Sequence, residues 1–217
     1  MNTETPDHIN RIPPSMAIAR YLHDHADAIS IELVGPMYDG EAQFTAPTLF
    51  VDGGTIFRGQ HEGLSVGDGD SFSGSLDECL NPHKDYSDLA YVLASLPTHF
   101  HKVTLSGFLG GRRDHELANL GEASCFLKHR HQATRIQFGM AICGFSPGDW
   151  QLEIHEPFSL MCLETAKLTL TGDCAYQLTE QTQIGLLCSH GLSNTGTGSI
   201  TLKTDAPVFI IYSDRKA

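Results

Sequence analysis

The stretch TLFVDGG at residues 48–54, followed by LSVGDGDS at residues 64–71, shows one pattern twice: a short apolar segment runs into acidic residues and glycines. Short apolar runs that stop at Gly and Asp are typical of buried strands. Helix-like segments and a further apolar segment follow up to about residue 130, so strands, loops and helices alternate. This alternation predicts a parallel sheet with helical crossovers, in which ligands bind beyond the carboxyl ends of the strands.

The segments around these two stretches complete the alternating pattern. We expect a short helix within residues 15–28, a strand-like segment at 29–34, a helix that begins near residues 85–88, a strand at 102–108 and a helix after GGRRDH at 110–115. In the second of these helices the apolar residues between Leu89 and Leu96 recur at helical spacing, and Pro97 ends the pattern. The first half of the chain is therefore predicted to be α/β.

The pattern changes after about residue 135. Short strand-like segments are expected at residues 135–143, 150–154, 158–163, 168–170, 184–188, 199–203 and 208–212. Turn residues separate them and no strong helix pattern is visible, which predicts an all-β sandwich. We therefore expect an N-terminal arm and short helix at residues 1–28, a parallel-sheet α/β domain at 29–143 and a β-sandwich domain at 144–217.

Acidic clusters fall at the ends of the expected strands and helices, at residues 52–54, 67–71, 84–88 and 110–115. Carboxylates beside glycines are poor core material, but they are good ligands for Mg²⁺, which prefers hard oxygen donors. Lys84 and Arg112, which belong to these clusters, are of the types that pair with phosphate oxygens. Together the clusters predict a metal-dependent site for a phosphorylated substrate.

Composition narrows the class of protein. The net charge of −12 and the pI near 5.3 argue against nucleic acid as the main partner, although they are compatible with ATP bound together with Mg²⁺. The six cysteines form no CxxC pair, which is typical of reduced thiols in a cytoplasmic protein. The N-terminal residues contain no apolar segment of a signal peptide, and no apolar run is long enough to span a membrane.

Taken in order, four motifs resemble those of the thiamine pyrophosphokinase family: DGG at residues 52–54, GDGDS at 67–71, KDYSD at 84–88 and GGRRDHELANL at 110–120. In the second half FSL at 158–160, LTLTG at 168–172 and GLSN at 191–194 resemble the strands and a turn of that family's β-sandwich. The resemblance implies an N-terminal α/β domain and a C-terminal β-sandwich. It also implies transfer of pyrophosphate from ATP to thiamine, giving thiamine diphosphate and AMP, by a homodimer whose site includes the sandwich of the other subunit.

The resemblance implies a role for each matching residue. The metal–phosphate site would be lined by Asp52, Asp68, Asp70 and Asp88, with Asp68, Asp70 and Asp88 holding Mg²⁺. ATP would contact Asp52, Lys84, Arg112, Asp114 and His115, and thiamine would contact Ser193 and Asn194. Lys84 and Arg112 would balance the charge that grows on the leaving phosphate. Either Asp70 or Asp88 would accept the proton of the attacking hydroxyl, and the sequence does not choose between them.

Other interpretations of the motifs stay open. GDGDS alone can be a turn that binds its own backbone, and Asp88 or Asp114 can cap a helix. Three His-x-His pairs, at residues 23/25, 99/101 and 129/131, lack a third zinc ligand at suitable spacing and are expected on the surface.

Two other functions are also compatible with the sequence. Gly69 stands where the family has Phe or Leu, which suggests a related pyrophosphokinase for another hydroxymethyl acceptor such as a pterin. A non-catalytic sensor of thiamine diphosphate or a nucleotide could keep the same fold.

Overall fold

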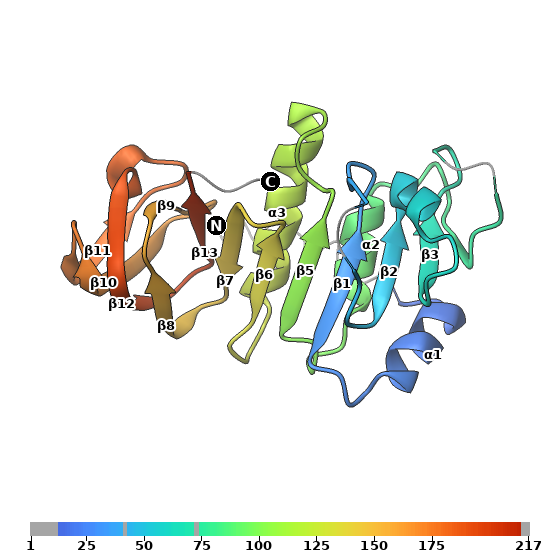
Figure 1. Cartoon of the computed structure of the whole chain (residues 1–217), viewed down its shortest axis with the longest axis horizontal. Coiled ribbons are helices and arrows are strands. Elements are labelled where there is room, and N and C mark those ends of the chain that lie inside the picture. The colour runs from blue at the N-terminus through green and yellow to red at the C-terminus, as the bar shows by residue number, and fades with distance from the viewer. Residues whose placement is uncertain (1–12, 41–42, 72–73, 214–217) are drawn as a thin grey trace, which may run out of the picture. The chain divides into compact units, whose positions relative to one another are not determined.

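The structure is a computed structural model that describes residues 13–40, 43–71 and 74–213 (Figure 1). The chain forms two compact units: unit 1 contains residues 1–100 and 105–122, and unit 2 contains residues 101–104 and 123–217. The expected arm at residues 1–12 lies outside the described residues. Within the described part of the chain, no helix is both long and apolar enough to cross a membrane.

Unit 1 is built on a parallel sheet with the strand order β1–β2–β3–β4 (Figure 1). Its strands are β1 (Ser30–Val34), β2 (Thr48–Val51), β3 (Leu64–Gly67) and β4 (Glu78–Cys79). All of β2 is buried, as expected for a strand of a sheet covered on both faces. The parallel sheet predicted for this part of the chain is confirmed, and it brings the carboxyl ends of β2 and β3 side by side.

The helices of the first half lie where the sequence predicts them. They are α1 (Met16–Asp24), α2 (Asp88–Ser95) and α3 (Arg113–Lys128), of which α3 continues into unit 2. Ser15 caps α1 and Ser87 caps α2, each by accepting a hydrogen bond from a backbone N–H of the first turn. Helix α2 packs against β2 and β3. A short 3₁₀ helix, η2 (Asp52–Phe57), was not predicted and follows β2 directly.

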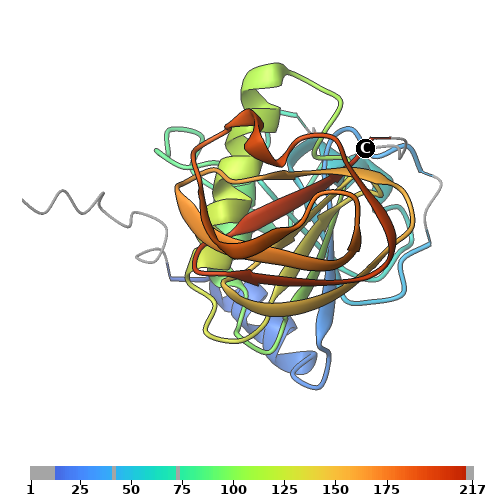
Figure 2. The same ribbon diagram turned by 90° about the vertical axis from the view of Figure 1, so that its left-hand side faces the viewer.

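Strand β5 (Lys102–Ser106) begins in unit 2 and ends in unit 1, where the N–H of Gly35 donates to the carbonyl of Ser106. The remaining strands of unit 2 are β6 (Arg135–Phe138), β7 (Ile142–Phe145), β8 (Gly148–Ile154), β9 (Pro157–Met161), β10 (Ala166–Cys174), β11 (Leu178–Ile184), β12 (Asn194–Thr204) and β13 (Val208–Tyr212). These eight strands pair antiparallel in two groups, β8–β12–β10–β11 and β6–β7–β13–β9. The first residues of β12 also pair with β9, which joins the groups. Figure 2 turns the strands of unit 2 toward the viewer.

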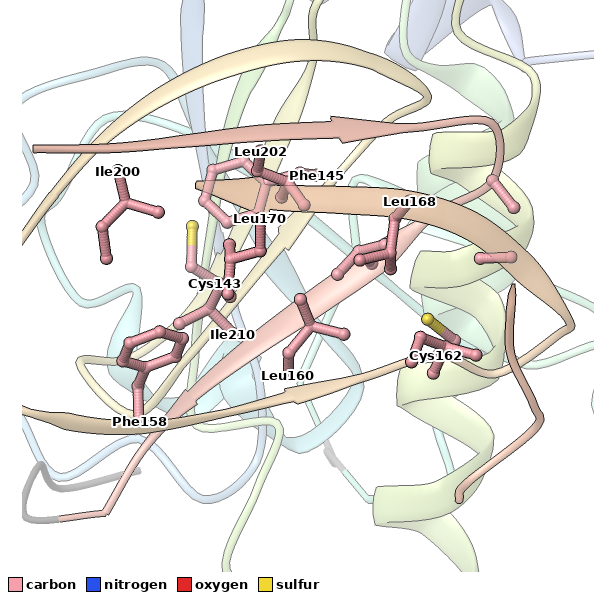
Figure 3. Close-up of a cluster of buried hydrophobic side chains, with 14 of the residues drawn as sticks. Cys143, Phe145, Phe158, Leu160, Cys162, Leu168, Leu170, Ile200, Leu202 and Ile210 are labelled. Carbon is pink, nitrogen blue, oxygen red and sulfur yellow. The ribbon is translucent and has the colours of Figure 1, made fainter. Parts of the chain in front are cut away.

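An apolar core of unit 2 is formed by side chains from both groups of antiparallel strands. Figure 3 shows side chains from both groups of strands pointing into the same interior, among them Phe158, Leu160, Leu170, Leu202 and Ile210. Each of these side chains is at most 2% exposed. Burying an apolar side chain of this size stabilises a fold by about 2 kcal/mol. The core explains why every second residue of β12 is buried, although most residues of this strand are polar or glycine.

Two strand predictions in the second half are wrong. Residues 135–143 form a hairpin and not one strand, because Gly139 takes a left-handed φ of 49° and the chain reverses between β6 and β7. Residues 185–188 form a turn, in which Leu187 has a φ of 47° and its N–H donates to the carbonyl of Cys162. The strand in this region is β11, which is mostly exposed and polar and therefore has no apolar pattern to reveal it.

The expected division at residues 143 and 144 falls inside unit 2. There β6 pairs with β7, and β7 pairs with β13, so residues before and after the division share one ladder. The division into an α/β domain at residues 29–143 and a β-sandwich domain at 144–217 stays a prediction.

Candidate functional site

The turn after β2 places Asp52 at the carboxyl end of the parallel sheet. Asp52 is the first residue of η2 and has a φ of 52°, a left-handed conformation that costs a non-glycine residue about 1 kcal/mol or more. Gly54 is required at this turn because a Cβ atom there would lie 2.1 Å from the carbonyl oxygen of Val34. The DGG motif is thus a tight turn that packs on the end of β1 and presents one carboxylate.

The GDGDS motif presents two more carboxylates at the end of β3. Asp68 Oδ1 accepts a hydrogen bond from the N–H of Asp70 at 3.3 Å, and Asp70 Oδ1 accepts one from the Ser71 hydroxyl at 2.8 Å. Gly69 between them has a φ of 82°, which favours glycine over the Phe or Leu of the resembling family. The turn that the motif can form by itself is therefore present, and it leaves both aspartates at one edge of the sheet.

The structure brings Asp52, Asp68 and Asp70 together. One carboxylate oxygen from each lies within 4.8 Å of the others, and among the described residues no other group of three His, Cys, Asp or Glu side chains converges in this way. In the same part of the chain, no Lys or Arg forms an ion pair with Asp52 or Asp70. Three crowded carboxylates with one nearby cation form a set of hard oxygen donors that fits Mg²⁺.

Lys84 lies beside this group and is almost fully buried. Its Nζ atom is 2.8 Å from Asp68 Oδ2 and 2.8 Å from Asp88 Oδ1, and the side chain is 7% exposed. Burial opposes the charge of Lys84, but the hydrogen bonds to both aspartates outweigh it and raise the pKa of the amine. The hydrogen bond from Lys84 likewise lowers the pKa of Asp68. Lys84 therefore remains protonated and bridges two carboxylates.

Asp88 lies against Lys84 and is not one of the three carboxylates that converge. Ser87 Oγ accepts from the N–H of Ala90 and caps α2, so the side chain of Asp88 is left for Lys84. Burial raises the pKa of Asp88, and the charges of Asp68 and Asp52 act in the same direction, while Lys84 opposes them. The group of three consists of Asp52, Asp68 and Asp70, which are three of the four aspartates expected at the metal–phosphate site. The metal role expected for Asp88 stays a prediction.

A cavity of about 210 Å³ adjoins the acidic group within unit 1. Its lining includes Pro36, Met37, Asp52, Phe108, Arg112 and His115. Asp52 belongs both to the acidic group and to the wall of the cavity, so the two features are continuous. Polar groups at the wall and apolar side chains beside them suit a ligand with a charged end and a flat, less polar end.

Asp114 does not line this cavity but holds Arg112, which does. The guanidinium of Arg112 forms two hydrogen bonds with the Asp114 carboxylate, and the pair lies on the surface. The hydrogen bond from Arg112 lowers the pKa of Asp114 to about 2, with a smaller contribution from the N–H of His115. Asp114 also does not act as the N-cap of α3, since the helix begins at Arg113.

Glu116 and Asn119 shape the motif at residues 110–120. No role was assigned to either residue from the sequence. Glu116 accepts a hydrogen bond from the N–H of Gly110 and pairs with Arg113, while Asn119 Nδ2 donates to the carbonyl of Phe108 at 2.8 Å. Both side chains therefore fasten the β5–α3 loop from the first turns of α3. The sequence signal for these two roles is the position of Glu116 and Asn119 a few residues after Gly110 and Gly111, because polar side chains near a glycine turn often bind its backbone.

In unit 2, Ser193 and Asn194 are neighbours at the start of β12. Ser193 has a φ of 60°, and its N–H donates to Ser159 Oγ at 3.2 Å. Asn194 Oδ1 accepts from the N–H of Tyr176 at 3.0 Å, and Nδ2 donates to the Tyr176 carbonyl at 2.8 Å. A small cavity of about 50 Å³ lies beside Asn194 and Tyr176. The side chain of Asn194 thus fixes the turn, and Ser193 is the more exposed of the two.

These features describe a mixed-sheet protein with an acidic group at the carboxyl edge of its parallel strands. No family model matches the chain, and no curated protein matches it in sequence. Solved structures do match. A thiamin pyrophosphokinase family protein from Enterococcus faecalis is 22% identical with a TM-score of 0.65, over 86% of this chain and 100% of that chain.

Two further thiamine pyrophosphokinases are similar. The enzyme from Bacillus subtilis is 20% identical with a TM-score of 0.61, over 86% of this chain and 100% of that chain. The enzyme from Candida albicans is 13% identical with a TM-score of 0.63, over 89% of this chain and 91% of that chain. At these identities the likeness establishes the fold alone. The chain has the fold of thiamine pyrophosphokinases, and the resemblance that the motifs predicted is confirmed at that level.

Proposed function

We propose that the protein is a thiamine pyrophosphokinase, which transfers pyrophosphate from ATP to the hydroxyl of thiamine and gives thiamine diphosphate and AMP. The observation that carries the proposal is the convergence of Asp52, Asp68 and Asp70 beside Lys84, at the carboxyl edge of the parallel strands, in a chain with this fold. The motifs that predicted the fold are the same ones that supply these four residues.

Mg²⁺ is the cation that we assign to the acidic group. Asp52, Asp68 and Asp70 would hold it, and when bound it would neutralise negative charge on the phosphate oxygens of ATP. The donor set supports this assignment, because it consists of carboxylates only and places one oxygen from each within 4.8 Å of the others. Asp88 would contribute through Lys84, which it helps to hold protonated.

ATP would extend from the acidic group into the adjoining cavity. In this arrangement Arg112 and His115 contact the nucleotide from the cavity wall, and Asp114 keeps the Arg112 guanidinium oriented until the nucleotide arrives. Asp52 would lie at the junction between the phosphates and the rest of the nucleotide. The placement is supported by the shared position of Asp52 and by the apolar wall at Met37 and Phe108.

The reaction needs little covalent chemistry from the protein. The thiamine hydroxyl oxygen forms a bond with the β-phosphorus, the bond from that phosphorus to the α,β-bridging oxygen breaks, and AMP leaves with the electron pair. Lys84 and Arg112 would stabilise the negative charge that develops. The hydroxyl proton would go to Asp70 or Asp88. Exposure favours Asp70, because the Asp88 side chain is only 9% exposed and lies against Lys84.

The remaining features of the enzyme are proposed from the resemblance. Ser193 would contact thiamine, and Asn194 would hold the turn that presents it. We also propose a parallel-sheet α/β catalytic domain followed by a β-sandwich domain, and a homodimer as the working form. A cytoplasmic location would keep the six cysteines reduced.

The test is AMP formation from ATP and Mg²⁺, with and without thiamine. We expect AMP only when thiamine is present, with thiamine diphosphate identified by its mass. AMP that appears with a pterin alcohol and not with thiamine would replace the proposed acceptor. Tight binding of thiamine diphosphate by folded protein that never releases AMP would show a sensor and overturn the proposal of an enzyme.

A further inference from the structure

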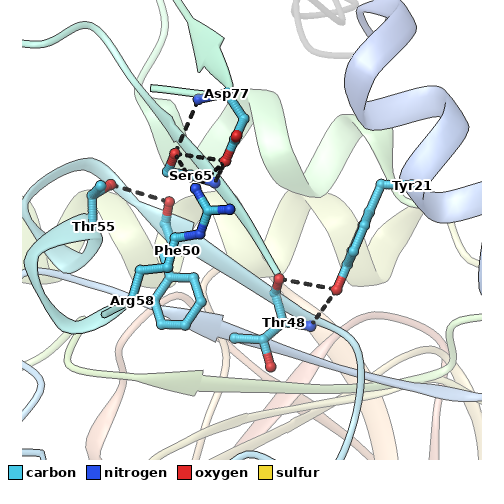
Figure 4. Close-up of polar contacts among 7 residues, drawn as sticks. All are labelled: Tyr21, Thr48, Phe50, Thr55, Arg58, Ser65 and Asp77. Carbon is cyan, nitrogen blue, oxygen red and sulfur yellow. Dashed lines mark hydrogen bonds and ion pairs between the residues drawn. The ribbon is translucent and has the colours of Figure 1, made fainter. Parts of the chain in front are cut away.

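A second polar cluster lies in unit 1 at the opposite end of η2 from Asp52. Arg58 follows the last residue of η2, and its N–H donates to the carbonyl of Thr55 at 3.2 Å. Its guanidinium forms an ion pair with Asp77 and lies 3.3 Å from Ser65 Oγ (Figure 4). Arg58 therefore connects η2 to two residues that lie outside it.

Asp77 and Ser65 bind one another through both side chain and backbone. Asp77 Oδ2 accepts from the N–H of Ser65 at 2.8 Å and from its hydroxyl at 2.8 Å, while the N–H of Asp77 donates to Ser65 Oγ at 3.0 Å (Figure 4). Ser65 is completely buried. Reciprocal bonds of this kind fix the two segments in one relative position, because each of the two residues both donates to the other and accepts from it.

These bonds lie close to the GDGDS loop, which carries Asp68 and Asp70 of the acidic group. The chain leaves the sheet after Gly67, at the end of β3, and passes through Asp68 and Asp70. It returns at Asp77, next to β4, where the N–H of Leu80 donates to the carbonyl of Gly67 at 2.7 Å. The bonds from Asp77 to Ser65 and from Leu80 to Gly67 therefore hold β3, which leads into Asp68 and Asp70, beside the chain around β4.

We propose that Arg58, Asp77 and Ser65 form a clamp that positions the acidic group. The clamp joins η2, which begins at Asp52, to the segment that contains Asp68 and Asp70, so it sets the distance between carboxylates that come from two different loops. These three are positioning residues, since none belongs to the acidic group itself. The inference rests on the proposed function only for the identity of the ligand that the acidic group binds. The contacts of the clamp do not depend on the proposed function.

The alternative is that the cluster stabilises unit 1 and has no effect on the acidic group. The ion pair is about one-third exposed on each side, and pairs at such positions contribute little to stability. A contact that supports metal ligands from outside the ligand set has a different signature, because its removal weakens metal binding by about 10-fold or more while the fold persists. A clamp therefore predicts a loss of metal affinity when it is removed, whereas a purely stabilising cluster predicts unchanged metal affinity.

The first experiment needs no ligand. Hydrogen–deuterium exchange would be compared in peptides that cover residues 52–58 and 64–71, for the wild type, Arg58→Ala, Asp77→Asn and the control Glu164→Gln. Glu164 forms an ion pair with Lys128 and is 32% exposed, which matches Asp77 at 31%. We expect faster exchange in both peptides for the first two variants and unchanged exchange for the control. Unchanged exchange in both clamp variants would overturn the proposal.

The second experiment measures binding of Mn²⁺, used alone as a probe of the acidic group, by electron paramagnetic resonance of the free ion. We expect Arg58→Ala and Asp77→Asn each to weaken Mn²⁺ binding about 10-fold. The double variant should be no weaker than either single variant, because both act through one contact. Arg58→Lys, which keeps the charge, should recover part of the affinity.

The failure of the clamp and the failure of the proposed function give different results. Wild-type affinity for Mn²⁺ in both clamp variants, with the binding lost in Asp68→Asn, would overturn the clamp and leave the metal site in place. A wild type that binds no Mn²⁺ and forms no AMP would remove the proposed function. In that case the exchange experiment still decides whether the clamp holds the two loops together.

Discussion

Lys84 and Arg112 both form ion pairs at the candidate site, but they differ in burial and in the number of their partners. Lys84 is 7% exposed and touches two carboxylates that come from different elements, the GDGDS loop and the start of α2. Arg112 is 71% exposed and pairs with Asp114, two residues away in the same loop. A buried pair is costly to break because one charge is left without a partner, whereas an exposed pair can exchange its partner for a ligand. The comparison indicates that Lys84 stabilises the structure of the site, whereas Arg112 is available to bind the nucleotide.

Replacing Lys84 should have the largest effect. Lys84→Met keeps the size of the side chain but leaves Asp68 and Asp88 as neighbouring, largely buried carboxylates without their cation. We expect the free energy of unfolding to fall by roughly 3 kcal/mol, together with loss of AMP formation. Urea denaturation measures the first effect. Wild-type stability in this variant would show that water already screens the charges of Asp68 and Asp88, so that they do not need Lys84.

Replacing Asp70 should reduce activity without reducing stability. Asp70 is exposed, and its carboxylate accepts a hydrogen bond from the hydroxyl of Ser71, so Asp70→Asn removes one charge from a crowded acidic group. We expect AMP formation to fall by about 100-fold, with the urea midpoint unchanged or slightly raised. Asp149→Asn is the matched control, because Asp149 is exposed and paired with Lys203 in unit 2. Normal turnover by Asp70→Asn would exclude the acidic group as the reaction site.

Much of this arrangement could be predicted from the sequence, because it follows from the topology. Once TLFV and LSV are assigned as neighbouring parallel strands, Asp52 and Asp68 must emerge at the same edge of the sheet. The sequence could not show which three of the four aspartates converge most closely, since this depends on the left-handed φ of Asp52 and on Ser87 taking the cap of α2. Asp77 was missed for a similar reason: its partner Ser65 is 12 residues away, and only the pairing of β3 with β4 brings them together.

The exposed pair should affect substrate binding alone. Arg112→Ala removes a guanidinium that lines the cavity but is not buried against the fold. We expect the KM for ATP to rise about 10-fold, which corresponds to about 1.4 kcal/mol and to one hydrogen bond to a charged group, with the urea midpoint unchanged. Arg113→Ala is the control, since Arg113 is 90% exposed and pairs with Glu116. Equal KM values in the two variants would contradict a role for Arg112 in nucleotide binding.

The smallest expected effect is a pH dependence of the stability that the ion pairs of Lys84 contribute. The two aspartates raise the pKa of Lys84 above its ordinary value of 10.5, so the folded chain holds this proton more tightly than the unfolded chain does. The resulting stability is fully present below pH 10.5 and is lost as pH rises from there through the folded-state pKa, with a slope of at most about 1.4 kcal/mol per pH unit. Unfolding free energies of the wild type and Lys84→Met, measured from pH 8 to 11, should therefore begin to converge only above about pH 10.5. Other titrating groups, such as Tyr21 with its raised pKa, cancel in the difference. Convergence that begins near neutral pH would mean that Lys84 loses its proton in the folded chain and does not hold the site as a cation.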